Sequence, residues 1–319
     1  MTGLGVRAKW SLLLVAALLV GGAAYTLLWP KSSSVTMLLA LAQTMAPEYP
    51  AQSHQPSHHD VVYATIDNRA LALDIYLPDG VEEPPLMVWV HGGAWMLGNK
   101  GWVQTYFVDH GIAIASVEYR LSTDAQFPAQ VHDIKAAIRF LRANAGQFGY
   151  NAERIVIAGE SAGAHLAALV GTTNGHAELE GTLGNHRDTS SRVQAILSFF
   201  GASNLTSILG QSTPHGVRVR EPALTLLLGE DYSPDIARLA SPVFHVDPDD
   251  PPLLLLHGDQ DHQMPINQSH ELDGAYQRSA LDVAFDVVHG AGHGGEAFYT
   301  GIHRDRALAF IARTIGAGQ

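Results

Sequence analysis

A serine that could act as a nucleophile stands at the centre of residues 159–163, which read Gly-Glu-Ser-Ala-Gly. The β-branched run 154–158 precedes this motif and predicts a buried strand, and the helix-forming run 164–170 follows it. A strand, a sharp turn and a helix are the setting in which a Gly-x-Ser-x-Gly motif presents a strained nucleophile. We therefore predict that Ser161 is a catalytic nucleophile rather than the N-cap of an ordinary turn.

A serine hydroxyl is a weak nucleophile and needs a base that is itself oriented by an acid. The apolar run 252–256 predicts a buried parallel strand, and Asp259 and Asp261 follow it. Both aspartates qualify as the acid, because catalytic groups in open α/β sheets lie just past the carboxyl ends of strands. The pattern His-Gly-x-x-Asp favours Asp261, and Asp259 is the alternative, whose ordinary role would be that of a turn residue.

Two histidines compete for the role of the base. Residues 281–288 alternate as a strand does, and His289 and His293 come after them. His293 is favoured because glycines flank it on both sides and because it lies farther beyond the strand. His289 sits at the strand edge, where a histidine bonded to backbone is the ordinary case. The resulting order of serine, aspartate and histidine is that of known hydrolases with this motif.

The negative charge that develops on the attacked carbonyl oxygen needs backbone N–H donors close to the serine. Residues 91–95 read His-Gly-Gly-Ala-Trp and follow the third predicted strand, and small residues there allow the backbone to approach a substrate closely. The predicted oxyanion hole consists of the N–H groups of Gly93, Ala94 and Ala162. Gly92 is predicted to shape the turn, and Trp95 either walls the substrate pocket or packs in the core.

With these motifs, the chain resembles the α/β-hydrolase superfamily. Within it, the chain is similar to the hormone-sensitive-lipase-like esterases, in the branch of bacterial carboxylesterases, acetyl-xylan-esterase-type enzymes and kynurenine formamidases. The resemblance runs from about residue 61 to the C-terminus and is also carried by residues 73–78, 118–122, 127–129, 133 and 240–243. It implies a serine hydrolase that needs neither a cofactor nor a metal ion. One departure is Ala94, which stands where the family usually has a further glycine.

The alternation of strand and helix patterns predicts an α/β fold with a doubly wound, mostly parallel eight-stranded sheet, a small cap and an N-terminal hydrophobic helix. The catalytic domain is expected over 61–319, with a cap-like insertion at about 202–240 that selects the substrate. Strands are predicted near 61–65, 71–77, 86–90, 112–117, 154–158, 194–200, 252–256 and 282–288. Helices are predicted near 99–110, 129–147, 161–173, 265–280 and 294–315.

The composition excludes several classes of function. The 319 residues carry a net charge of −12 without a basic run after the first few residues, which argues against a nucleic-acid partner. Cysteine is absent, so neither disulfides nor thiol chemistry is possible. The histidines at 54, 58 and 59 lie in a predicted polar linker and lack the ligand spacing of a zinc site, so no metal site is predicted.

The N-terminal part has its own organisation. Residues 11–28 form an uncharged stretch bracketed by Trp10 and Trp29, so residues 1–30 are predicted to be an uncleaved signal-anchor or a cleaved signal peptide. Both alternatives imply membrane association or secretion, with the catalytic domain outside the cytoplasm. Residues 31–60 are predicted to be an apolar helix near 35–46 followed by a linker.

Together these patterns predict a serine carboxylesterase that hydrolyses short-chain or aryl esters through an acyl-enzyme. One alternative is an amidase or formamidase of the kynurenine formamidase type, which would use the same triad on a different small-molecule substrate. A second alternative, from another class, is a non-catalytic binding module on the same fold. Such modules usually lack a triad member, and here every member has a candidate.

Overall fold

The computed structural model describes residues 54–316. The predicted membrane segment 11–28 and the predicted apolar helix 35–46 lie outside the described residues. Among the residues that are described, no helix is long and apolar enough to cross a membrane.

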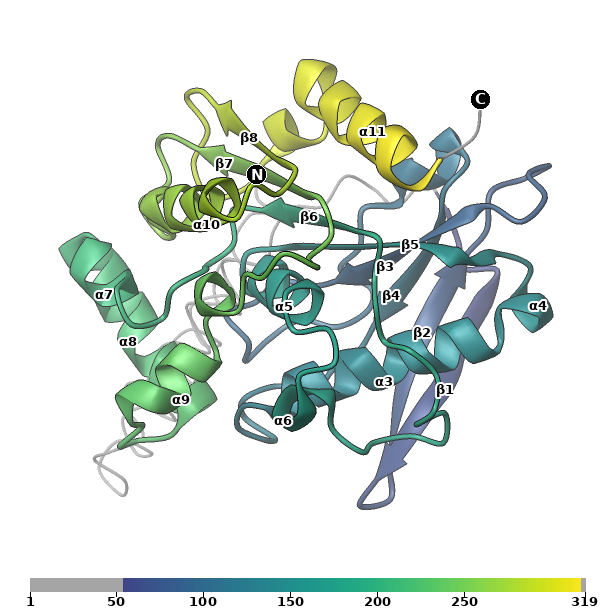
Figure 1. The fold of residues 1–319 in the computed structure, drawn as a ribbon, viewed down its shortest axis with the longest axis horizontal. Coiled ribbons are helices and arrows are strands. Elements are labelled where there is room, and N and C mark those ends of the chain that lie inside the picture. Colours follow the sequence, from purple (N-terminus) through teal and green to yellow (C-terminus); the bar gives the residue numbers. More distant parts are fainter. Residues whose placement is uncertain (1–53, 317–319) are drawn as a thin grey trace, which may run out of the picture. The chain divides into compact units, whose positions relative to one another are not determined.

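Eight strands form one sheet, in the order β1-β2-β4-β3-β5-β6-β7-β8 (Figure 1). β2 is antiparallel to both of its neighbours, and the other neighbouring pairs are parallel. The strands are β1 His58–Ile66, β2 Arg69–Tyr76, β3 Pro85–Val90, β4 Ala113–Val117, β5 Asn151–Glu160, β6 Ala195–Phe199, β7 Leu253–Gly258 and β8 Val283–Val288. The predicted doubly wound, mostly parallel sheet is therefore confirmed, with a strand at each predicted position.

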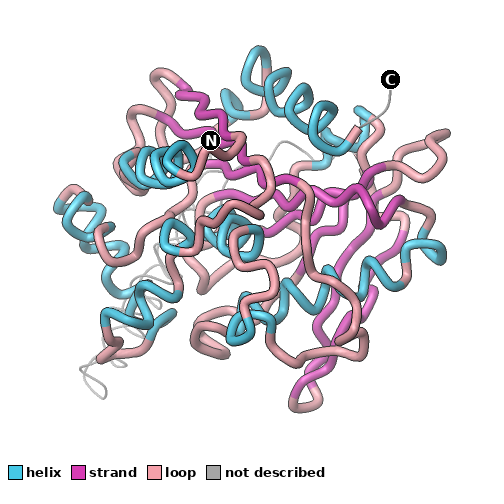
Figure 2. Tube along the Cα trace, in the orientation of Figure 1, coloured by secondary structure: helices cyan, strands magenta, loops and turns pink. Residues whose placement is uncertain are grey.

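Helices cover both faces of this sheet, which is why its central strands are apolar throughout. Along β3, Leu86, Val88 and Val90 belong to one buried cluster, which includes side chains of the helices α3 (Ala129–Ala143) and α5 (Ala162–Gly171). The alternate residues Met87 and Trp89 belong to the opposite cluster, with α11 (Gly301–Ile315). Figure 1 shows α3 and α11 on opposite sides of the sheet, and Figure 2 shows the loops that join strands and helices.

Three of the predicted helices differ in extent from the observed ones. The helix predicted near 99–110 is only a 3-10 helix, Thr105–His110, because Asn99 caps a turn by accepting a hydrogen bond from Gly101 N–H at 2.8 Å. The helix predicted near 129–147 is divided at Asn144, after which the short α4 (Ala145–Phe148) follows. The last helix begins at Gly301 rather than near 294, because Gly294 and Gly295 have φ values of 95° and 107° that a helix excludes.

The predicted cap interval contains three helices, α7 (Ile208–Gln211), α8 (Pro214–Leu228) and α9 (Pro234–Leu239). Thr213 and Ser233 cap the latter two with side-chain oxygens, and a proline follows each cap. The remaining elements are α6 Ala177–Glu180, α10 Asn267–Arg278 and the 3-10 helices Pro242–Phe244 and Glu296–Phe298.

The predicted boundary between linker and catalytic domain was wrong by a few residues. β1 begins at His58, and Ser57 Oγ accepts a hydrogen bond from Leu77 N–H at 3.0 Å. His54 Nε2 lies 2.8 Å from Asp109 Oδ1, and the ring of His58 packs edge-on against Phe148. The polar composition of this stretch suggested a solvated linker, but its side chains make specific contacts with the domain.

Candidate active site

Ser161 lies at the sharp turn between β5 and α5. Its backbone has φ 53° and ψ −119°, a conformation that costs a residue with a side chain on the order of 1–3 kcal/mol. The two flanking glycines are required by space, because a Cβ on Gly163 would lie 2.0 Å from Val90 O and one on Gly159 would lie 2.6 Å from the same oxygen. The motif therefore forms the strained turn that its sequence predicted, with the hydroxyl raised above the sheet edge.

The three residues favoured as a triad are brought together from three separate loops. His293 Nε2 lies 2.8 Å from Ser161 Oγ, and His293 Nδ1 lies 2.7 Å from Asp261 Oδ2. A carboxylate only accepts hydrogen bonds, so the imidazole carries its proton on Nδ1 and offers the lone pair of Nε2 to the hydroxyl. This is the hydrogen-bond chain that general-base activation of a serine requires.

The carboxylate of Asp261 is completely buried and is held by a tight loop after β7. Its Oδ1 accepts hydrogen bonds from the N–H groups of Gln263 and Met264 at 2.8 and 2.7 Å. Burial alone would raise the pKa of Asp261, but the charge of His293 and hydrogen bonds from His257, His293 and Met264 lower it below its usual value. Asp261 is thus an anion at neutral pH, as an acid that orients an imidazole must be.

The two alternative candidates, Asp259 and His289, are paired with each other instead of with Ser161. His289 Nδ1 lies 2.8 Å from Asp259 Oδ2, and Asp259 Oδ1 accepts a hydrogen bond from Gly290 N–H at 2.7 Å. The His289 side chain is 84% exposed. The pair joins the loops after β7 and β8 on the surface, and it contributes no group to the nucleophile.

The predicted oxyanion donors lie around the same turn. Ala162 is the first residue of α5, so its N–H has no partner in the helix. Among residues 54–316, no acceptor is found for the N–H groups of Gly93, Ala94 and Ala162. Gly93 has φ 110°, and a Cβ there would lie 2.4 Å from Leu97 O, so this position requires glycine. Three N–H donors without an acceptor in the described part of the chain match what a developing oxyanion needs.

The two residues predicted to shape the substrate site have different positions. A Cβ on Gly92 would lie 3.1 Å from Glu160 O and 3.5 Å from Ser161 Cβ, so Gly92 lets the loop approach the nucleophile turn. Trp95 is 2% exposed and belongs to the core cluster, which is the second of the two roles that the sequence left open for it.

The sequence patterns did not point to Glu160, which immediately precedes Ser161. Its carboxyl group is buried, and its Oε2 accepts a hydrogen bond from Tyr299 Oη at 2.6 Å. Burial raises the pKa of Glu160 to about 7, against the opposing effect of the bond from Tyr299. The motif allows any residue at position 160, so the sequence did not predict a buried carboxyl group there. The hydrogen-bond partner of this group is Tyr299, which lies 139 positions away.

The raised pKa of Glu160 has a consequence for stability. Between pH 4.5, the ordinary pKa of a glutamate, and about 7, the folded protein keeps a proton that the unfolded chain releases, so the free energy of unfolding falls as pH rises through this window. At one pKa unit per 1.36 kcal/mol, the loss is roughly 3 kcal/mol at most. We expect Glu160→Gln to remove this loss of stability. The melting temperature of the variant, relative to that of the wild type, should therefore rise by several degrees between pH 5 and pH 8. Thermal melts of both proteins, with the exposed Glu230→Gln as the control for charge removal, measure this gap. A gap that stays constant with pH contradicts the prediction.

A cavity of about 550 Å³ opens beside His293. It lies between the start of the cap helix α8 and the loops after β7 and β8, and most of its side chains are polar: Thr213, His215, Gln260, His262, Gln263, Gly292 and His293. The cap interval was predicted to contribute to the substrate site and His293 was predicted to be the base, but the other lining residues were not predicted. Only the capping signal at Thr213 and Pro214 marked this place in the sequence.

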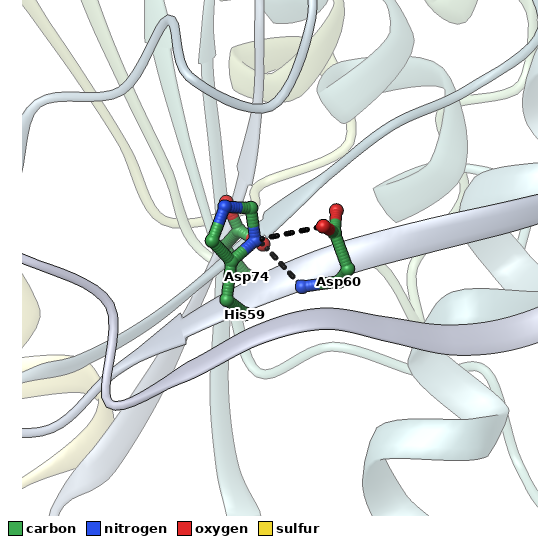
Figure 3. A group of neighbouring side chains, drawn as sticks. All are labelled: His59, Asp60 and Asp74. Carbon is green, nitrogen blue, oxygen red and sulfur yellow. Dashed lines mark hydrogen bonds and ion pairs between the residues drawn. The ribbon is translucent and has the colours of Figure 1, made fainter.

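Within residues 54–316, one group of three side chains could offer ligands to a metal ion, His59, Asp60 and Asp74 (Figure 3). His59 Nδ1 lies 2.9 Å from Asp74 Oδ1 and 3.2 Å from Asp60 Oδ2. Lys100 Nζ already lies 2.7 Å from Asp60 and 3.0 Å from Asp74. An ammonium group therefore occupies the place that a cation would take, and the cluster is an ion-pair network on the β1–β2 edge.

The sheet order, the strained serine turn and the three loops that meet there define an α/β hydrolase. The chain belongs to the BD-FAE family, whose model matches residues 73–276.

Individual relatives point the same way. Esterase LipC of Mycobacterium tuberculosis (strain ATCC 25618 / H37Rv) is 32% identical over 238 residues, which cover 72% of this chain and 58% of that protein. A carbohydrate esterase from gut microbiota, in a truncated form, has a TM-score of 0.71 at 30% identity and covers 83% of this chain and 98% of its own. The thermophilic esterase Est2 of Thermogutta terrifontis, solved with propionate bound, has a TM-score of 0.64 at 25% identity over 81% of this chain and 93% of its own. The chain spans less than two thirds of the length of the curated relatives it matches.

Proposed function

We propose that this protein is a serine carboxylesterase that works through an acyl-enzyme. The observation that carries the proposal is the chain of short contacts from Asp261 through His293 to Ser161, together with the N–H groups of Gly93, Ala94 and Ala162, which find no acceptor among residues 54–316. The family and the esterases named above support ester hydrolysis. A non-catalytic binding module would have no need for a strained serine with its base in place.

In the proposed mechanism, Ser161 Oγ attacks the ester carbonyl while His293 Nε2 takes its proton. Asp261 stabilises the resulting imidazolium, and the oxyanion accepts hydrogen bonds from Gly93, Ala94 and Ala162. Collapse of the tetrahedral intermediate breaks the ester C–O bond, and His293 returns the proton to the leaving alcohol. A water molecule then attacks the acyl-enzyme by the same route, which releases the acid and restores the serine.

We infer that the substrates are short-chain or aryl esters. We expect the methyl group of Ala94, which a glycine would lack, to narrow the space for the acyl group next to the proposed oxyanion donors. The relative Est2 was solved with propionate, a short acid.

A series of p-nitrophenyl esters from acetate to laurate tests this acyl preference. We expect kcat/KM to be highest between acetate and butyrate and to fall at least about tenfold by octanoate, because a pocket that fits a short acyl chain must be forced open to admit a longer one, at a cost of about 1–3 kcal/mol. A profile that rises toward laurate would contradict the short-chain assignment. N-formylkynurenine serves as the amide probe, and faster turnover of it than of every ester would favour a formamidase.

We also propose that residues 11–28 hold the protein at a membrane or direct its export, with the catalytic domain outside the cytoplasm. The support is the uncharged 18-residue stretch itself and the basic residues Arg7 and Lys9 before it. Fractionation of cells that express the full chain, followed by mass determination of the recovered protein, distinguishes an intact anchor from a cleaved signal peptide. Recovery of the intact chain in the cytoplasmic fraction would refute both.

A further inference from the structure

The loop that carries two of the predicted oxyanion donors has an unfavourable backbone conformation. Ala94 and Trp95 have φ values of 51° and 62°, in the left-handed region that residues with a Cβ avoid, and they follow Gly93 at 110°. Consecutive residues of this kind persist only where their surroundings leave them no better alternative. The loop therefore depends on contacts that hold it.

The side chain of Trp95 supplies such a contact. Its indole N–H donates a hydrogen bond to Nδ1 of His165 at 3.0 Å, and the two rings meet edge to face with centroids 5.3 Å apart. The backbone oxygen of Trp95 also accepts a bond from Ser122 N–H at 2.8 Å. The indole bond joins the oxyanion loop to the helix of the nucleophile, because His165 lies on α5 and its own N–H donates to Ser161 O at 3.0 Å.

The protonation of His165 follows from these partners. An indole nitrogen can only donate, so Nδ1 must present its lone pair and the ring proton must be on Nε2. This Nε2–H donates to the backbone oxygen of Ala240, 2.7 Å away, at the end of the cap helix α9. Burial lowers the pKa of His165 to about 4, so the ring stays neutral and able to accept near neutral pH. One imidazole thus connects the oxyanion loop, the nucleophile helix and the end of the cap.

We propose that His165 is a positioning residue for the oxyanion hole. By holding the indole of Trp95, it keeps the N–H groups of Gly93 and Ala94 aimed at the carbonyl that Ser161 attacks. The proposal rests on the proposed function, because a hole that holds an oxyanion has a role only if acyl transfer occurs. The side chains of Trp95 and His165 are both buried, so they act on the reaction through the geometry of the oxyanion loop and not through contact with the substrate.

The test uses two matched substitutions of buried tryptophans. Trp95→Phe removes the indole donor and keeps an aromatic ring in the core. Trp89→Phe is the control, since Trp89 is also buried but belongs to the core cluster on the other face of the sheet, and its indole donates to Trp102 O at 2.8 Å and not to the helix of Ser161. We expect both to lower the melting temperature, but only Trp95→Phe to lower kcat for p-nitrophenyl acetate, by roughly 10- to 100-fold with KM nearly unchanged. The rate at which a fluorophosphonate phosphonylates Ser161 should fall together with kcat. The phosphoryl oxygen of the reagent needs the same N–H donors as the oxyanion of the ester reaction.

Substitution of the histidine separates its two bonds. His165→Asn keeps an acceptor near the position of Nδ1 for Trp95 but loses the bond to Ala240, whereas His165→Leu loses both. We expect the asparagine variant to keep kcat within about fivefold of the wild type, and the leucine variant to lose as much as Trp95→Phe.

The outcomes are distinct. Equal loss of kcat in the two tryptophan variants, or no loss in Trp95→Phe, overturns the positioning role while the wild type remains an active esterase. Equal loss in the two His165 variants also overturns it, since the bond to Trp95 would then be irrelevant. A wild type that neither hydrolyses esters nor reacts with the fluorophosphonate refutes the proposed function and the positioning role together.

Discussion

Ser161→Ala is expected to abolish hydrolysis of p-nitrophenyl acetate by the purified protein, with a loss in kcat on the order of 10⁵-fold or more. The hydroxyl lies 2.8 Å from His293 Nε2, and its removal leaves no atom that can form the acyl-enzyme. Residual turnover would come from water that His293 activates directly beside the oxyanion donors, which is a much slower reaction. Initial rates over a range of substrate concentrations measure the effect.

Two further measurements complete this test. The melting temperature of the variant should stay close to that of the wild type, because alanine occupies the same strained backbone and loses a single surface-facing oxygen. A fluorophosphonate should label the wild type at Ser161 and leave the variant unlabelled. Hydrolysis that survives in the variant at more than a few per cent would mean that a different residue is the nucleophile.

Asp261→Asn should reduce kcat by roughly 10³- to 10⁴-fold, whereas Asp259→Asn should change it less than about fivefold. An asparagine at 261 can offer an N–H to His293 and thereby favour the imidazole tautomer with its proton on Nε2, which cannot accept the serine proton. The pair Asp259–His289 lies on the surface and does not contact the triad.

The same comparison applies to the histidines. His293→Ala should lose activity on the scale of Ser161→Ala, and His289→Ala should keep nearly all of it. Because the two aspartates are two residues apart on one loop, Asp259→Asn also controls for general disturbance of that loop. Comparable losses in Asp259→Asn and Asp261→Asn would remove the distinction that the observed geometry makes between them.

The sequence by itself determined the sheet and the sharp turn that carries Ser161, because both depend on short-range patterns. Runs such as 86–90 and 252–256 are apolar throughout, which only a strand buried on both faces tolerates, and each became a strand. The glycines around Ser161 specify a sharp turn, since any Cβ there meets the backbone of β3. Helix ends were less certain: the stretch before Gly301 has helical composition, but its glycines have dihedral angles that end any helix.

Only the tertiary structure shows which of the two candidate aspartates pairs with which of the two candidate histidines. Asp259 and Asp261 are both aspartates past the same strand, and local pattern favours one without showing where either carboxylate points. The register of β7 beside β8 brings both loops together, and each aspartate then takes a different histidine as its partner. The partners of buried polar groups are equally non-local. The buried carboxyl group of Glu160 accepts a hydrogen bond from Tyr299, and the buried indole of Trp95 donates one to His165. The members of these pairs are 139 and 70 residues apart in the sequence, so neither composition nor local spacing predicts that they meet. Only the packing of the whole chain determines which of these groups come into contact.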